Sequence, residues 1–328
     1  MNPTTFAHFM PLVRSKKFRS ILKVIAWVIV VQFILLNISA ALYAYKFTHF
    51  YNSGEYQTSS QNVLSKTWRL FAGPKFYKAT KEKEPDFPFE TIQLETKKGL
   101  AIHAWYSTVD SSKACVILLH GVSVNKSYVV SEAEAFRQLG YNVLLIDFRG
   151  HGLSDGNTTT FGDDETLEVK AAFHFATSKG NQKIILYGTS LGAVVAIKAA
   201  ADKIIKPHAI VAEMPFGSLQ DHLEARARIV GFPSQPFAFF VTLWMGIERG
   251  YNGFGHNTSA YAKDIDCPVL LQWGDKDQYV SKEETYSVFD NLSSQKKLVT
   301  YAAGHESLLK ADATKWYNEV AAFLQTAR

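Results

Sequence analysis

The sequence contains little cysteine, because only Cys115 and Cys267 occur among its 328 residues. Each lies at the start of an apolar run with the composition of a core strand, and we interpret both as buried thiols. Two cysteines are too few for the disulfide framework that stabilises small exported domains. The fold must therefore depend on apolar packing, and 47% hydrophobic with 20% charged residues is ordinary for a globular protein.

The sequence also lacks the short motifs of metal and nucleotide sites. Its ten histidines form no His-Glu-x-x-His group and its cysteines no Cys-x-x-Cys group. The glycines that follow apolar runs match neither a phosphate loop nor a dinucleotide fingerprint. No internal repeat indicates a solenoid or a propeller. We therefore expect no metal ion and no cofactor.

Acidic residues are absent from residues 1–50, which carry six basic residues. The rest of the chain has 29 basic residues (35 less these six) and 30 acidic ones. A nucleic-acid-binding domain requires a basic face, and this balance gives no support for one. We expect no nucleic-acid partner.

Charge is also absent from the apolar run Val24 to Tyr45. Its 22 residues are enough for a helix to cross a hydrocarbon core of about 30 Å, so we predict a transmembrane helix over 24–45. Five of the six basic residues precede the run, which by the positive-inside rule places residues 1–23 in the cytoplasm and the remainder on the exported side, whether periplasmic, extracellular or lumenal. A cleaved signal peptide and a buried core helix remain as alternatives, although the run is long for a signal peptide.

Residues 46–86 are mostly polar around an aromatic and basic patch. One interpretation is a juxtamembrane linker that packs on the following domain. The other is an amphipathic element in the membrane interface, with the aromatic side chains directed inward and the basic ones outward. These aromatic residues are Trp68, Phe71, Phe76 and Tyr77.

Residues 87–328 alternate short apolar runs with helix-length segments. The runs at 90–96 and 100–107 are typical of a hairpin, and the later runs are continuously apolar, as parallel strands covered on both faces require. We therefore predict an α/β fold with a mostly parallel central sheet flanked by helices. The predicted core strands are 114–120, 142–148, 183–188, 209–214, 268–274 and 297–303. The intervening helices are 127–140, 162–180, 191–204, 281–292 and 307–327.

One interval is too long for a single crossover. About 50 residues separate the strands at 209–214 and 268–274, and they are rich in aromatic residues with several Gly and Pro. We interpret residues 216–262 as a cap inserted over the open end of the sheet.

Two serines fit the pattern Gly-x-Ser-x-Gly, Ser154 and Ser190. Ser190 directly follows an apolar strand and precedes a helix that begins with small residues, which is the setting of a nucleophile elbow. Ser154 lies in a polar, glycine-rich loop. We predict that Ser190 is the nucleophile.

A serine nucleophile needs a base that is oriented by a third group. Asp275 and Asp277 follow one predicted strand and His305 follows the next, so all three lie at the edge where a parallel sheet collects its active site. The order Ser190, Asp277, His305 is that of the α/β-hydrolases.

Four motifs make residues 90–328 resemble an α/β-hydrolase domain of the monoacylglycerol-lipase-like and serine-aminopeptidase-like groups: "HG" at 120–121, "DFRGHGLS" at 147–154, "GTSLG" at 188–192, and "GDKD" with a later "GH". The resemblance favours Asp277 as the acid over Asp275 and Glu213. It implies oxyanion donors at the amides of Val122 and Leu191. It also implies structural roles for four residues of the first two motifs, His120, Asp147, Arg149 and His151.

The sequence therefore predicts a membrane-anchored serine hydrolase that cleaves a carboxylic ester through an acyl-enzyme without a cofactor. The aromatic cap and the neighbouring bilayer favour a hydrophobic acyl ester, such as a lysolipid or a monoacylglycerol. Two alternatives stay open: an amide or peptide substrate, and a non-catalytic binding domain of the same fold.

Overall fold

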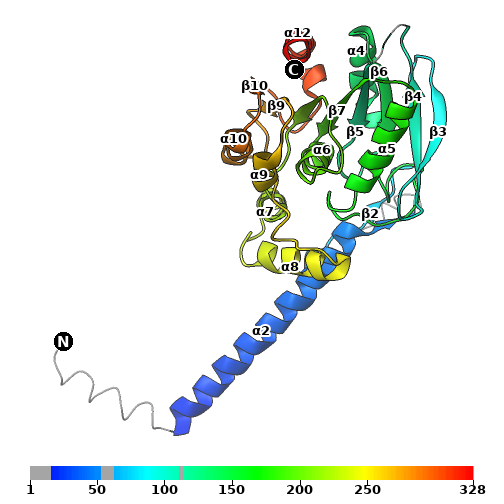
Figure 1. Ribbon diagram of the computed structural model, residues 1–328. Helices are drawn as coiled ribbons and strands as arrows, with labels where there is room; N and C mark the ends of the chain where they lie inside the picture. The colour runs from blue at the N-terminus through cyan, green and yellow to red at the C-terminus, as the bar shows by residue number, and fades with distance from the viewer. Residues whose placement is uncertain (1–15, 53–62, 111, 113, 328) are drawn as a thin grey trace, which may run out of the picture.

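The computed structural model describes residues 16–52, 63–110, 112 and 114–327. Eight strands form the central sheet, and only the second of them, β4, runs antiparallel to its neighbours (Figure 1). They are β3 (Glu90–Glu95), β4 (Ala101–Ser107), β5 (Ala114–Leu119), β6 (Asn142–Ile146), β7 (Lys183–Thr189), β8 (Ala209–Glu213), β9 (Val269–Gly274) and β10 (Lys296–Tyr301). Their order across the sheet is β10-β9-β8-β7-β5-β6-β4-β3. The predicted hairpin and parallel core are confirmed.

The central strands are continuously apolar in sequence because both faces of the sheet are covered. Every residue of β6 and β8 is buried. Helix α6 is buried along its whole length, which explains a sequence that is apolar on all sides. Cys115 and Cys267 are free thiols, and Cys115 lies in the core. The helices of this domain are α4 (Val130–Gln138), α5 (Thr166–Ser178), α6 (Leu191–Ala201), α10 (Lys282–Asn291), α11 (Leu308–Ala311) and α12 (Ala313–Thr326), with a 3-10 turn η1 (Lys126–Val129).

The last predicted helix, 307–327, is two helices in the structure, α11 and α12. The break lies at Asp312, whose backbone is not helical (φ −152°, ψ 85°). Its side chain accepts a hydrogen bond from the Lys315 amide at 3.0 Å, so the aspartate acts as an N-cap and starts a new helix.

Helix α2 (Lys16–Thr48) runs past both ends of the predicted 24–45 span. By length and composition it could cross a membrane. Its first part projects from the domain with exposed apolar side chains, and its last part packs against the domain (Figure 1). Ser39, Ala40 and Ala44 are buried there. Phe33 and Asn37 of α2 contact Phe240 and Trp244 of helix α8 (Phe237–Arg249), and Ala40 and Ala44 continue this face at helical spacing, where small side chains allow a close approach.

The segment after α2 is fixed to the domain by its backbone. Strands β1 (Phe50–Tyr51) and β2 (Phe76–Tyr77) pair in parallel, and helix α3 (Val63–Ala72) lies between them in the chain. The Phe50 amide donates to the Asn157 carbonyl at 2.7 Å. Asn125 donates through its side chain to the carbonyls of Ala79 and Lys81, at 2.8 and 2.7 Å. Part of this segment therefore packs as a linker, whereas α3 exposes Leu64 and Trp68.

Residues 216–262 contain helices α7 (Leu219–Ile229), α8 and α9 (Thr258–Tyr261), followed by the 3-10 turn η2 (Ala262–Asp264). Backbone hydrogen bonds close the base of this insertion: the Leu219 amide donates to the His256 carbonyl and the Thr258 amide to the Gly217 carbonyl, at 3.0 and 2.8 Å. Helix α8 contacts both α7 and α2, so the insertion joins the domain to the apolar helix.

The close contact between α2 and α8 gives a first prediction. The substitution Ala44→Phe forces a ring into a site with no exposed surface, and overpacking of this kind costs about 1–3 kcal/mol. We expect the melting temperature of the full chain in detergent to fall by several degrees. Val28→Phe, on the exposed part of the same helix, should leave it unchanged, and equal melting temperatures for both variants would contradict the packing described.

Candidate active site

Ser190 stands at a sharp turn between β7 and α6. Its backbone has φ 53° and ψ −116°, a region that non-glycine residues rarely adopt and that is strained. The turn is held by the Ser190 amide, which donates to the Glu213 carbonyl at 2.8 Å, and by the Ser190 carbonyl, which accepts from the Ala193 amide at 3.0 Å. The serine hydroxyl is thereby fixed at the end of the strand.

The two glycines of the motif are required by space. A Cβ atom at Gly188 would lie 2.3 Å from the Gly192 carbonyl oxygen, and one at Gly192 would lie 2.1 Å from the Leu119 carbonyl oxygen. Both contacts are with backbone atoms, which cannot move aside without distorting β5 or α6. The pattern Gly-x-Ser-x-Gly is therefore a packing requirement of this turn.

The structure brings together the three residues predicted from the sequence. His305 Nε2 lies 3.0 Å from Ser190 Oγ, and His305 Nδ1 lies 2.6 Å from Asp277 Oδ2. The other carboxylate oxygen of Asp277 accepts from the amides of Tyr279 and Val280, at 2.7 and 3.0 Å. The Asp277 side chain has no exposed surface. With Nδ1–H donating to this carboxylate, Nε2 is free to accept the serine proton.

The competing acidic residues lie elsewhere. Asp275 is exposed. Glu213 is fully buried, and its Oε1 accepts from Trp316 Nε1 at 2.7 Å. Burial raises the pKa of Glu213 to about 8, because a charge there has no water to solvate it. Glu213 supports the turn through its backbone carbonyl and makes no bond to His305.

Ser154, the rival serine, is buried in the loop after β6. Its hydroxyl donates to the Asp147 carbonyl at 2.7 Å and accepts from the His103 amide at 2.9 Å. No histidine ring nitrogen of the described chain contacts it. The serine of the second Gly-x-Ser-x-Gly match therefore has a structural role: its hydroxyl joins the loop to β4.

His120 shapes the turn that follows β5. Its Nδ1 bonds the Gly121 carbonyl at 2.6 Å, and its Nε2 accepts from the Phe148 amide at 3.1 Å. Burial lowers the pKa of His120 to about 3, so the ring is neutral and both nitrogens are used. A Cβ atom on Gly121 would lie 3.6 Å from the Ser190 Cβ, which places this turn beside the serine. Val122 follows in the same turn.

Leu191 is the first residue of α6, and first-turn amides have no intrahelical partner. Its N–H and that of Val122 are the two donors that the sequence predicted for an oxyanion. Leu191 directly follows Ser190 in the chain, and Val122 directly follows Gly121, the residue that approaches Ser190.

Arg149 and His151 fix the loop after β6. The Arg149 guanidinium donates to Glu168 Oε1 at 2.6 Å and to Asp164 Oδ2 at 2.7 Å, and His151 Nδ1 bonds the Arg149 carbonyl at 2.8 Å. These contacts agree with the structural roles that the resemblance implies.

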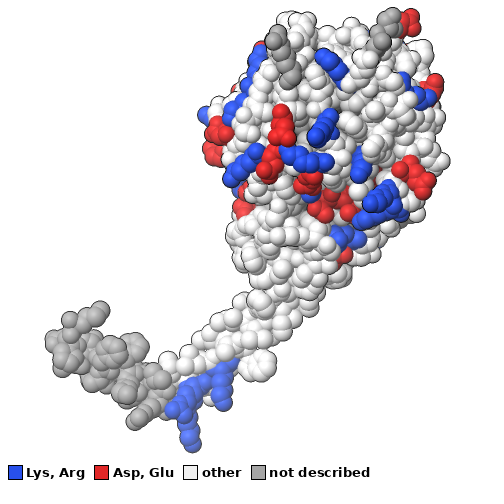
Figure 2. Space-filling view, viewed as in Figure 1, with Lys and Arg blue, Asp and Glu red and all other residues white. Residues whose placement is uncertain are grey.

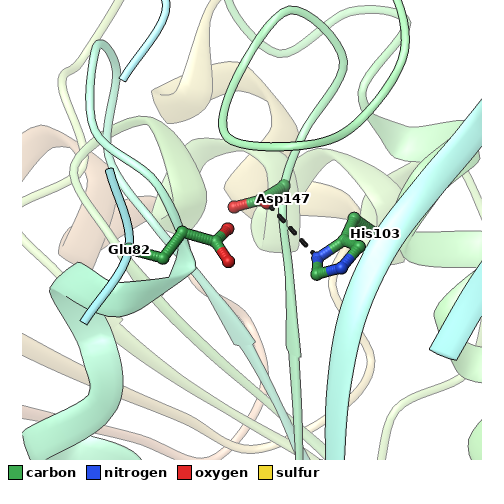
Figure 3. A group of neighbouring side chains, drawn as sticks. All are labelled: Glu82, His103 and Asp147. Carbon is green, nitrogen blue, oxygen red and sulfur yellow. Dashed lines mark ion pairs between the residues drawn. The ribbon is translucent and has the colours of Figure 1, made fainter. Parts of the chain in front are cut away.

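Three possible metal ligands, Glu82, His103 and Asp147, point toward one another in the described chain (Figure 3). The ammonium group of Lys126, which is fully buried, already donates to Glu82 and, at 2.8 Å, to Asp147 Oδ2. The Lys126 amide donates to the other Asp147 oxygen at 2.8 Å. Because a lysine cation occupies the centre of this group, the three residues do not fit a metal ion. Their contacts with Lys126 instead anchor the turn that carries Val122.

A cavity of about 530 Å³ reaches Tyr279, the aromatic neighbour of His305, although none of the three triad residues lines it. One wall is Tyr279, whose ring packs against the His305 ring with centroids 5.1 Å apart. The remaining walls come from α2, α3, α7 and α8, and include Tyr43 and Phe47. Sequence reasoning missed this cavity, because no pattern in the sequence shows that the apolar helix returns to the domain.

Residues 110–240 match the family model described as serine aminopeptidase, S33. Among curated proteins, the chain is 25% identical to protein bem46 of Schizosaccharomyces pombe over 78% of each chain. It is 26% identical to the lysophosphatidylserine lipase ABHD12 of Danio rerio, over 59% of this chain and 51% of that protein. This chain therefore spans about half the length of ABHD12.

Solved structures of the same fold include an esterase from Pyrococcus furiosus, Pf2001. It superposes with a TM-score of 0.64 at 24% identity, over 76% of this chain and 98% of the esterase. The mostly parallel sheet, the strand–turn–helix at Ser190 and these similarities agree with one another. The chain belongs to the α/β-hydrolase superfamily.

Proposed function

We propose that the protein is a membrane-anchored serine hydrolase that cleaves a carboxylic ester, with Ser190, His305 and Asp277 as its catalytic triad. The observation that carries this proposal is the continuous hydrogen-bonded chain from the buried Asp277 carboxylate through His305 to the Ser190 hydroxyl. The hydrolase class is supported by the relatives and neighbours named as a lipase and an esterase.

In the proposed reaction, Ser190 Oγ attacks the ester carbonyl carbon while His305 Nε2 accepts the hydroxyl proton. The amides of Val122 and Leu191 stabilise the oxyanion of the tetrahedral intermediate. As the carbon–oxygen bond to the alcohol breaks, His305 returns the proton to the leaving oxygen. Water then attacks the acyl-enzyme, with His305 again as base, and Asp277 stays ionised throughout.

An ester is favoured over a peptide by the composition of the cavity. An aminopeptidase requires an anionic group to bind the free α-ammonium of its substrate, and the described residues that line the cavity include no acidic side chain. Its surface is mainly apolar, which suits a hydrocarbon chain.

We also propose that α2 anchors the protein in a bilayer. Four basic residues lie in the first turns of α2 and none in its apolar middle, and Figure 2 shows the resulting basic patch at the start of the helix. This distribution favours a cytoplasmic N-terminus and an exported domain. Protease added to vesicles that are sealed with their exported face outward should therefore digest the domain and leave a protected N-terminal fragment. Protection of the domain until the membrane is permeabilised would reverse this topology.

The triad is tested by labelling. The Ser190→Ala variant should lose all reaction with a fluorophosphonate probe and lower the turnover of p-nitrophenyl esters by at least about a thousandfold, because the nucleophile is removed. Ser154→Ala is the matched control and should still be labelled. If Ser190→Ala matched the wild type, the domain would be the non-catalytic binding module instead.

The acid is tested by a pair of isosteric variants. Asp277→Asn should lower kcat by about 10⁴-fold, since the amide no longer holds His305 in the required tautomer. Glu213→Gln should stay within a few-fold of the wild type in p-nitrophenyl ester assays, because the Glu213 carboxyl bonds Trp316 and not His305. The reverse pattern would assign the acid to Glu213.

A further inference from the structure

The charged residues that line the cavity all have one sign. Three basic residues, Lys66, Arg69 and Arg226, stand among aromatic and aliphatic ones, and no acidic side chain accompanies them in the described chain. Lys66 and Arg69 belong to α3, at the side of the cavity formed by the segment after the apolar helix. Arg226 belongs to α7 and lies deeper. A cavity of this composition is complementary to a molecule with a hydrocarbon part and an anionic part.

Arg226 is held in place without a carboxylate partner. Its Nε donates to His222 Nε2 at 2.9 Å, and its guanidinium lies over the rings of Tyr279 and Phe47, 5.7 and 5.6 Å from their centroids. Among the described residues no aspartate or glutamate pairs with it. Arg228, two positions along, is exposed and lies 3.8 Å from Glu224. Of the two arginines of α7, the one in the cavity is therefore the one without a carboxylate partner.

The surroundings of Arg226 leave its terminal nitrogens available to a ligand. Burial and the nearby Arg226 charge hold the pKa of His222 well below its usual range, so the neutral ring accepts from Nε. Burial also lowers the pKa of Arg226, because a largely buried cation with no anion nearby is costly. A bound anion would remove that cost, and a guanidinium binds phosphate through two parallel hydrogen bonds.

One aromatic ring separates Arg226 from the triad. Tyr279 contacts both the Arg226 guanidinium and the His305 ring. The backbone amide of Tyr279 donates to Asp277, so the same residue fixes the acid of the triad. Two successive contacts, of 5.7 and 5.1 Å, thus connect Arg226 to the His305 ring.

We propose that Arg226 binds the phosphate of the substrate, so that the ester hydrolysed at Ser190 belongs to a phosphate-bearing single-chain lipid, whose hydrocarbon part contacts the cavity walls from α2 and α8. This inference rests on the proposed function and narrows its substrate class. Lys66 and Arg69 lie on the side from which a lipid leaving the bilayer would enter.

The test compares three oleoyl esters in uncharged detergent micelles with the full-length protein. Lysophosphatidylglycerol carries a phosphate and a net charge, lysophosphatidylcholine carries a phosphate and no net charge, and oleoylglycerol carries neither. For Arg226→Gln, we expect the ratio of kcat/KM for each phosphate-bearing ester to that for oleoylglycerol to fall by about tenfold or more, the value of one lost charge-assisted interaction. Arg226→Lys should restore part of the ratio.

Arg228→Gln is the matched control, because it removes one positive charge from the same helix outside the cavity. Its ratios should equal those of the wild type. Equal losses on all three esters in Arg226→Gln would overturn the proposal in favour of a positioning role for Arg226 toward Tyr279. A loss confined to lysophosphatidylglycerol and shared by Arg228→Gln would overturn it in favour of long-range attraction.

The carboxylate of the released fatty acid is the other anion that could reach Arg226. If Arg226→Gln weakened inhibition by oleate but left the substrate ratios unchanged, the residue would bind the product and the proposal would be wrong. Fluorophosphonate labelling separates this inference from the proposed function. A wild-type protein that is not labelled contradicts the hydrolase itself, whereas a labelled protein with unchanged ratios contradicts only the phosphate site.

Discussion

The site depends on one strained residue, Ser190, whose positive φ is maintained by the packing around it. Strain of this kind costs on the order of 1–3 kcal/mol and persists only where neighbouring structure determines it. Here the determinants are a strand that ends at Thr189, a helix that begins at Leu191, and two glycines that let backbones meet where no Cβ fits. The same turn exposes the hydroxyl to His305 and leaves the first amide of α6 free beside it.

Buried groups hold this turn and the one beside it. Glu213 holds the Ser190 amide through its carbonyl, and His120 holds the adjacent turn with both ring nitrogens. Lys126 joins that turn to Asp147 and to Glu82 of the segment that follows the apolar helix. The segment that follows the proposed anchor is therefore bonded, through Glu82, to the loop that carries Val122. It contributes to the structure of the site in addition to linking the domain to α2.

Much of the fold, and the meeting of Ser190, His305 and Asp277 at one edge of the sheet, could be predicted from the sequence because local patterns determine them. Continuous apolar runs require a sheet that is covered on both faces. A strand followed by Gly-x-Ser-x-Gly and a helix is compatible with few structures other than the sharp turn at Ser190. Asp277 and His305 each follow a strand, so the topology alone brings them to one edge.

The cavity could not be predicted in this way. Arg226 lies in a helical segment with alternating arginines, and nothing local distinguishes it from the exposed Arg228. Its isolation from carboxylates results from tertiary contacts with Phe47 and Tyr279, which are distant in the chain. The return of α2 onto α8 likewise depends on small residues that the sequence shows only as part of an apolar run.

The central claim is that Ser190 forms a covalent acyl-enzyme. It is tested most directly by mixing the full-length protein with a p-nitrophenyl ester, quenching in acid during turnover, and locating the added acyl mass by peptide mass spectrometry. The account predicts one acyl group, on the peptide that contains Ser190. Turnover with the acyl group on another residue, or with no acylated peptide under conditions that give a burst of p-nitrophenol, would contradict it.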